Sequence, residues 1–138
     1  MKMLLTKRFA FEMAHALPHY EGRCRHLHGH SYHLEVTVEC AADALDDDGM
    51  ALDFHRLKQL VQQTVVDRFD HALVLPKGVH LLADDADCPN LIEVPFQPTT
   101  ERLLLHFASL LQPEMPAGAR LYSIKLAETD TSVAELVL

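Results

Sequence analysis

The stretch CRHLHGHSYHLEVTVE, residues 24–39, decides how this chain folds, because a histidine-rich run passes directly into an alternating one. From residue 32 to residue 39 apolar and polar side chains alternate, which is the pattern of a β-strand with one buried face. His28 and His30 have the parity of the apolar residues. The apolar positions are Tyr32, Leu34, Val36 and Val38, and the polar positions are His33, Glu35, Thr37 and Glu39.

Three further strands are predicted by similar patterns. Residues 7–15 and 120–128 alternate with period two, and the final segment 133–138 follows a turn signal at TDTS. In both alternating segments the apolar face ends in a polar group. The first face is formed by Phe9, Phe11, Met13 and His15, and the second by Tyr122, Ile124, Leu126 and Glu128.

Two helices are predicted between the second and third strands. Apolar residues recur at helical spacing over 54–69, and Asp53 precedes them as an N-cap. The stretch 97–113 has the same periodicity, with Thr99 or Thr100 as its cap. We therefore expect two amphipathic helices.

The order strand, strand, helix, helix, strand, strand indicates an α+β domain. Both helices would pack on one face of a four-stranded antiparallel sheet. Between the helices we expect a short extended piece at 70–76 and a loop at 77–90. A chain of 138 residues fits one domain, residues 1–138. Because the outer strands of such a sheet would be exposed, we also expect an oligomer.

Composition and charge narrow the class of partner. The net charge of −8 argues against a protein that grips nucleic acid through its phosphates. A small anionic substrate would need a local basic pocket, for which Arg23 and Arg25 are the candidates. No apolar run has the length of a membrane span or a secretory signal, so we expect a cytoplasmic protein without a membrane partner. Its three cysteines, an odd number without regular spacing, are expected to be free thiols.

His15, His28 and His30 are candidate zinc ligands. Residues two apart in a strand project to the same side, and an antiparallel neighbour would bring His15 beside the other two. Three neutral imidazoles without a thiolate leave the ion an open position, as in catalytic zinc sites. The alternative is three ordinary, partly buried histidines.

Three other groups have more than one interpretation. Cys24 is a fourth zinc ligand, a nucleophile, a base or an inert thiol. Asp70 and His71 are neighbours in an extended segment and point opposite ways, so they act together only if the backbone turns or another subunit supplies the partner. Glu128, at the end of a buried-facing pattern, needs a hydrogen-bond donor. That donor is an amino-nitrogen heterocycle, or else an internal lysine or backbone amide.

The motifs FEMAH, CRHLHGHSY, LDF, FDH, PTTE and AETDTS occur in an order that resembles the 6-pyruvoyl-tetrahydropterin synthase family. The short chain and the motif CRHLHGH also resemble its bacterial branch, the 6-carboxytetrahydropterin synthases of the queuosine pathway. The resemblance covers nearly the whole chain. Met13 stands where a small residue is usual, and Arg102 stands where asparagine is common.

The resemblance implies a tunnelling fold, in which ββααββ subunits form an oligomeric barrel with active sites at the subunit interfaces and a hexamer favoured. It also implies a lyase that acts on 7,8-dihydroneopterin triphosphate. It implies that His15, His28 and His30 are Zn²⁺ ligands and that Glu128 anchors the pterin. It also implies that Cys24, Asp70 and His71 are catalytic, with Asp70 and His71 contributed across an interface.

Four functions remain open from the sequence. The first is a 6-carboxytetrahydropterin synthase that releases acetaldehyde and triphosphate. The second is a 6-pyruvoyl-tetrahydropterin synthase, which eliminates triphosphate only. The third is a zinc-binding module without turnover, closed by Cys24 as fourth ligand, and the fourth is a cysteine hydrolase built on Cys24, His71 and Asp70.

Overall fold

The two longest strands form the centre of the molecule. In the computed structural model, which describes residues 1–81 and 88–138, β1 (Lys2–His15) pairs antiparallel with β2 (His28–Ala41) along its whole length. The register places His15 directly opposite His28. Alternate residues of both strands are buried, which confirms the predicted faces and puts the histidines on the core side.

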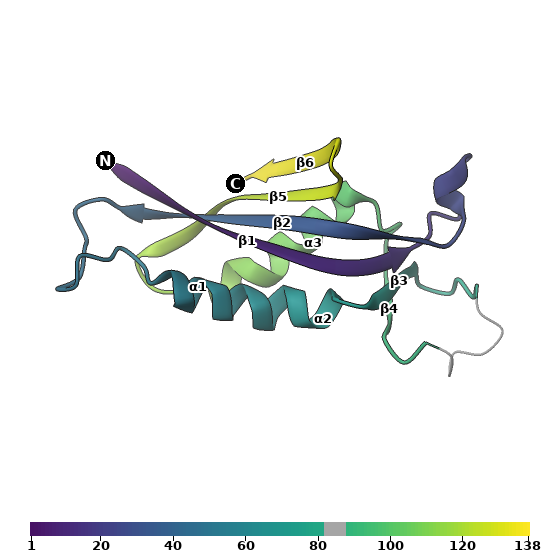
Figure 1. Cartoon of the computed structure of the whole chain (residues 1–138), viewed down its shortest axis with the longest axis horizontal. Helices are drawn as coiled ribbons and strands as arrows, with labels where there is room; N and C mark the ends of the chain where they lie inside the picture. The colour runs from purple at the N-terminus through teal and green to yellow at the C-terminus, as the bar shows by residue number, and fades with distance from the viewer. Residues whose placement is uncertain (82–87) are drawn as a thin grey trace.

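The described strands form one mixed sheet of six, in the order β4-β3-β1-β2-β5-β6 (Figure 1). The antiparallel members beyond the central pair are β5 (Ala119–Thr129) and β6 (Ser132–Val137). On the other side, β3 (Ala72–Pro76) and β4 (Leu91–Val94) are parallel to β1 and to each other. The predicted four-stranded antiparallel sheet is therefore wrong. The reason is that β3 is a five-residue apolar run without alternation, and such a run does not reveal its pairing partner.

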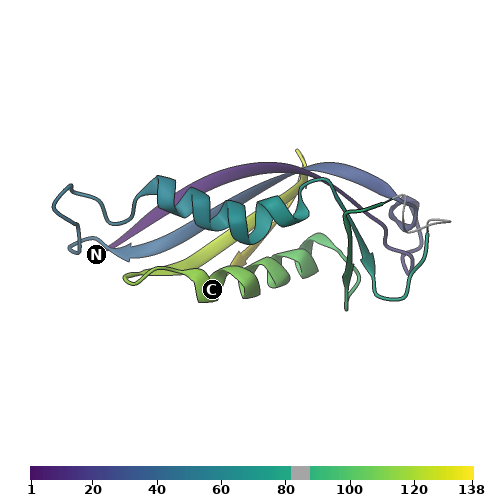
Figure 2. The same cartoon turned by 90° about the horizontal axis from the view of Figure 1, so that it is seen from below.

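Both predicted helices lie on the same side of the sheet (Figures 1 and 2). The first is α1 (Phe54–Val61), continued by a π-helical turn (Gln62–Val66) and α2 (Asp67–Phe69), and Asp53 caps it by accepting from the His55 amide at 2.8 Å. The second is α3 (Thr100–Leu111), capped by Thr99. The expected loop at 77–90 has no helix or strand in its described part, and residues 82–87 lie outside the described residues.

Two irregularities in β5 change which side chains face the core. The first bulge lies opposite Thr37 and Val38, and beyond it Leu121 is buried while Tyr122 is only half-buried. The predicted inward position of Tyr122 is therefore wrong, because an extra residue inverts the alternation. The second irregularity lies at Glu128, between Ala127 and Thr129. It occurs where the strand meets the histidines.

Besides the end strands β4 and β6, most of β1 lacks a partner on one side among the described strands. On the side away from β2, β1 pairs with β3 only at Met13–His15. The sheet ends in β4 on this side and in β6 on the other, where Val133 and Val137 are 58% and 59% exposed. No helix within the described ranges has the length and apolarity needed to cross a membrane.

Candidate active site

The three predicted histidines meet at one end of the central strand pair. His15 is the last residue of β1, and His28 and His30 open β2. Their ring centroids are 4.6, 5.2 and 4.8 Å apart, and the Nε2 atoms of His15 and His28 are separated by 2.9 Å. The predicted convergence of the three rings is therefore what the fold produces.

Backbone carbonyls fix the tautomers of two of these rings. The Nδ1 of His15 lies 2.8 Å from the Pro98 carbonyl oxygen, and the Nδ1 of His28 lies 2.6 Å from that of His26. A carbonyl only accepts, so each Nδ1 carries a proton and donates it, which leaves the Nε2 lone pair directed inward. Burial also lowers the pKa of His15 and of His30, which favours the neutral rings that bind metals.

The cluster fits a metal ion better than it fits a set of core histidines. Two imidazole rings that are protonated only at Nδ1 would turn lone pairs toward each other at the 2.9 Å that separates the Nε2 atoms of His15 and His28. The Nε2 of His30 is buried and has no well-directed hydrogen bond among the described residues. A cation among the three nitrogens removes both conflicts. Imidazole nitrogens suit Zn²⁺ among the common metals.

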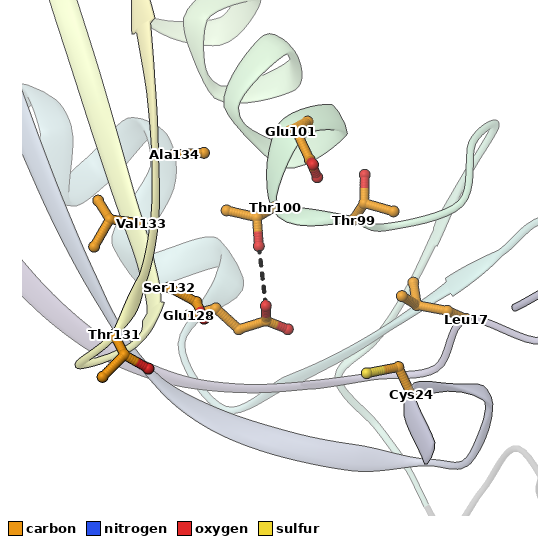
Figure 3. Close-up of a pocket in the computed structure, with 10 residues that line it drawn as sticks. All are labelled: Leu17, Cys24, Thr99, Thr100, Glu101, Glu128, Thr131, Ser132, Val133 and Ala134. Carbon is orange, nitrogen blue, oxygen red and sulfur yellow. Dashed lines mark hydrogen bonds between the residues drawn. The ribbon is translucent and has the colours of Figure 1, made fainter. Parts of the chain in front are cut away.

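A pocket of about 360 Å³ adjoins this cluster. Cys24 and Glu128 line it, together with Thr100 and Glu101 at the start of α3 and residues 131–134, which lead into and begin β6 (Figure 3). The thiol and the carboxylate are directed into the same space. The pocket therefore brings the predicted Cys24 and Glu128 together beside the histidines.

Glu128 connects the pocket to the histidines. Its Oε1 lies 2.8 Å from the Nε2 of His30 and 3.4 Å from that of His15, while its Oε2 accepts from the Thr100 hydroxyl at 3.4 Å. The ligand atoms of His15, His28, His30 and Glu128 all lie within 4.8 Å of one another. Within the part of the chain that the structure describes, Cys24 does not belong to this group.

Asp70 and His71 form a hydrogen-bonded pair because the backbone turns between them. His71 has φ of +60°, and its Nδ1 lies 2.9 Å from Oδ1 of Asp70. The pair is fixed to β1 at Glu12, whose amide donates to Asp70 and whose carbonyl accepts from the His71 amide. Of the two routes left open by the sequence, the local turn is the one observed. The His71 side chain is 73% exposed and does not line the pocket that contains Cys24.

The left-handed backbone at His71 leads to a stability prediction. A β-carbon in this conformation costs about 1 kcal/mol or more, and glycine avoids that cost. We expect His71→Gly to unfold at a higher denaturant concentration than His71→Ala, by about 1 kcal/mol in the free energy of unfolding. Urea titration followed by circular dichroism measures the difference. Equal stability of the two variants would show that no backbone strain is stored at this position.

Some site residues were not found from the sequence. Glu101 and Thr100 line the pocket, and the Pro98 carbonyl orients His15. The PTTE motif was the available signal for the first two, while a backbone acceptor has no signal in residue type. Arg23 and Arg25 are exposed on a short 3₁₀ turn and do not line the Cys24 pocket.

The known proteins that this chain is similar to belong to one family. The model of the 6-pyruvoyl tetrahydropterin synthase family matches residues 4–137. The 6-carboxy-5,6,7,8-tetrahydropterin synthase of Rickettsia bellii is 31% identical to this chain, and the match covers 95% of this chain and 97% of that protein. The enzyme of the same name from Synechocystis sp. is 35% identical, and the match covers 95% of this chain and 90% of that protein. The structure of Caenorhabditis elegans 6-pyruvoyl tetrahydropterin synthase shares the fold, with a TM-score of 0.73 at 20% identity, over 100% of this chain and 96% of that one. The chain belongs to the 6-pyruvoyl tetrahydropterin synthase family.

Proposed function

We propose that this chain is a zinc-dependent lyase that converts 7,8-dihydroneopterin triphosphate and water into 6-carboxy-5,6,7,8-tetrahydropterin, acetaldehyde and triphosphate. The observation that carries the proposal is the convergence of three imidazole Nε2 atoms beside a pocket lined by Cys24 and Glu128. The names of the relatives that are 31% and 35% identical support the 6-carboxy product. Queuosine biosynthesis is the corresponding pathway.

Each group in the site has a role in this chemistry. His15, His28 and His30 would hold the zinc ion, which would act as a Lewis acid and lower the pKa of a nearby substrate hydroxyl. Cys24, directed into the pocket, takes and returns a proton at the side-chain carbons of the substrate.

Recognition and the second proton carrier complete the site. Glu128 accepts hydrogen bonds from the amino and ring nitrogens of the pterin, and these bonds are strong because the acceptor is charged. Glu101 is a second carboxylate in the same pocket and is available to the same donors. His71, oriented by Asp70, is the second proton carrier.

The geometry within one chain favours this function over the two alternatives from other classes. A closed zinc module requires Cys24 among the metal ligands, and in the described residues the ligand group contains Glu128 instead. A hydrolase within one subunit requires His71 beside Cys24, but His71 is 73% exposed outside that pocket. The 6-pyruvoyl synthase remains the second candidate, because the family includes that activity and both reactions use the same groups.

We also propose that the active site is completed between subunits. The Asp70–His71 pair is exposed and lies outside the Cys24 pocket of its own chain, so it would act on a substrate bound in the pocket of another subunit. The unpaired length of β1 and the edge strand β6 are able to pair with strands of other copies. A hexamer built from one-domain subunits, residues 1–138, is our expectation. The free thiols of Cys24, Cys40 and Cys88 support a reducing compartment such as the cytoplasm.

The identity of the product tests the proposed function. Purified, zinc-loaded protein is incubated with 7,8-dihydroneopterin triphosphate under reducing conditions, and products are identified by mass, with acetaldehyde trapped as its hydrazone. We expect 6-carboxytetrahydropterin and acetaldehyde in equal amounts. A 6-pyruvoyl product without acetaldehyde would select the second candidate, and an unchanged substrate would reject both.

A further inference from the structure

We propose that Glu128 is the fourth ligand of the metal in the substrate-free protein, an inference that rests on the proposed function. In the proposed function Glu128 recognises the pterin. Its position gives it a second role, because Oε1 lies 2.8 Å from Nε2 of His30 and 3.4 Å from Nε2 of His15.

The short approach of Glu128 to His30 is not an ordinary hydrogen bond. At 2.8 Å the two atoms are close enough for one, yet Nε2 of His30 has no partner of acceptable direction among the described residues. A neutral ring nitrogen and a carboxylate oxygen that share no proton repel each other at this distance, and a cation between them removes the repulsion. Neighbouring ligands of a tetrahedral zinc ion with bonds of about 2.0–2.1 Å are separated by roughly 3.3 Å. The contacts of 2.8, 2.9 and 3.4 Å surround that value.

The backbone and the second oxygen of Glu128 hold the carboxylate in this orientation. The irregularity between Ala127 and Thr129 lies at Glu128, and such features redirect side chains near active sites. The hydroxyl of Thr100, at the start of α3, donates to Oε2 at 3.4 Å and leaves Oε1 toward the histidines. One oxygen therefore faces the metal position while the other is held by the helix terminus, an arrangement typical of a supported ligand.

Charge supports the same assignment. Three neutral imidazoles leave a zinc ion with its full double charge, beside His15 that is completely buried. An uncompensated charge in such surroundings is costly, and one carboxylate halves it. Cys24 lines the same pocket but lies outside the group of ligand atoms. Glu128 also lines the pocket. A bound pterin would therefore draw the carboxylate away from the metal, and a coordination position would become free only when the substrate is bound.

Metal affinity and the spectrum of cobalt-substituted protein test this inference without any measurement of turnover. Competition with a chromophoric chelator gives the affinity for Zn²⁺, and the d–d absorption of the Co²⁺ form reports the ligand set. We expect Glu128→Ala to lose at least about 10-fold in affinity and to change the cobalt band, because even outer-shell changes cost 10- to 100-fold. Glu128→Gln should show a smaller loss and an altered band.

Two variants serve as matched controls. Glu101→Gln removes a carboxylate from the same pocket, and Cys24→Ser removes the thiol, so both should leave the affinity and the cobalt band unchanged. An unchanged affinity and band in Glu128→Ala would overturn the inference, as would a lost thiolate-to-cobalt band in Cys24→Ser. If Glu128→Ala binds like wild type while His28→Ala does not bind, the proposed function survives and only this inference fails. If wild type binds no metal, the proposed function itself fails.

Discussion

His28→Ala is expected to release the metal and to lower kcat/KM for the pterin triphosphate by about a thousand-fold or more. His28 supplies one of three convergent Nε2 atoms, and its tautomer is fixed by the His26 carbonyl. A Lewis acid contributes several kcal/mol to a transition state, and about 4 kcal/mol corresponds to a thousand-fold in rate. Elemental analysis of the dialysed protein and steady-state kinetics measure the two effects.

His33→Ala is the matched control, because His33 lies on the same strand but on its exposed, polar face. It should keep both the metal and the activity. Thermal unfolding adds an independent readout, since a ligand that binds only the folded state stabilises it. A chelator should therefore lower the Tm of wild type and of His33→Ala, but not that of His28→Ala. Full activity of metal-free His28→Ala would exclude zinc-dependent chemistry at this site.

Cys24→Ala is expected to lower kcat by about 10²- to 10⁴-fold, the usual contribution of a positioned acid or base, while the metal content stays the same. The thiol is directed into the pocket beside Glu128 but lies outside the group of metal ligand atoms. Loss of rate and loss of zinc are therefore separable. Single-turnover kinetics with zinc quantified in the same sample make the measurement.

Cys88→Ser is the control for this experiment, because Cys88 is a partly buried free thiol that packs near Leu73 and Leu75 and does not line the pocket. Its rate should equal that of wild type. Wild-type turnover in Cys24→Ala would contradict the catalytic role of the thiol. Loss of zinc from Cys24→Ala would contradict its position outside the metal ligands. The second outcome would restore the closed four-ligand module as the better interpretation of the site.

The positions of the three histidines, the candidate metal ligands, were predictable because they depend on local alternation. A strand turns successive side chains to opposite faces, so the apolar parity of 32–38 fixes the side on which His28 and His30 lie. The same parity in β1 placed His15 on the core face, and antiparallel pairing brought it opposite His28. The helix starts at Asp53 and Thr99 were readable for the same reason, since a cap acts on amides two or three residues away.

The sequence alone therefore determined the two long strands, the two helices, the faces they bury and the identity of the residues around the metal position. Tertiary structure decided the parallel strands β3 and β4, the irregularity at Glu128 and the turn that brings His71 onto Asp70. The turn at His71 and the pairing of β3 depend on distant segments, as when Asp70 accepts from the amide of Glu12, 58 positions away. Periodicity is a property of adjacent residues, whereas the pairing of β3 and the approach of Glu128 to the histidines require that distant segments pack together.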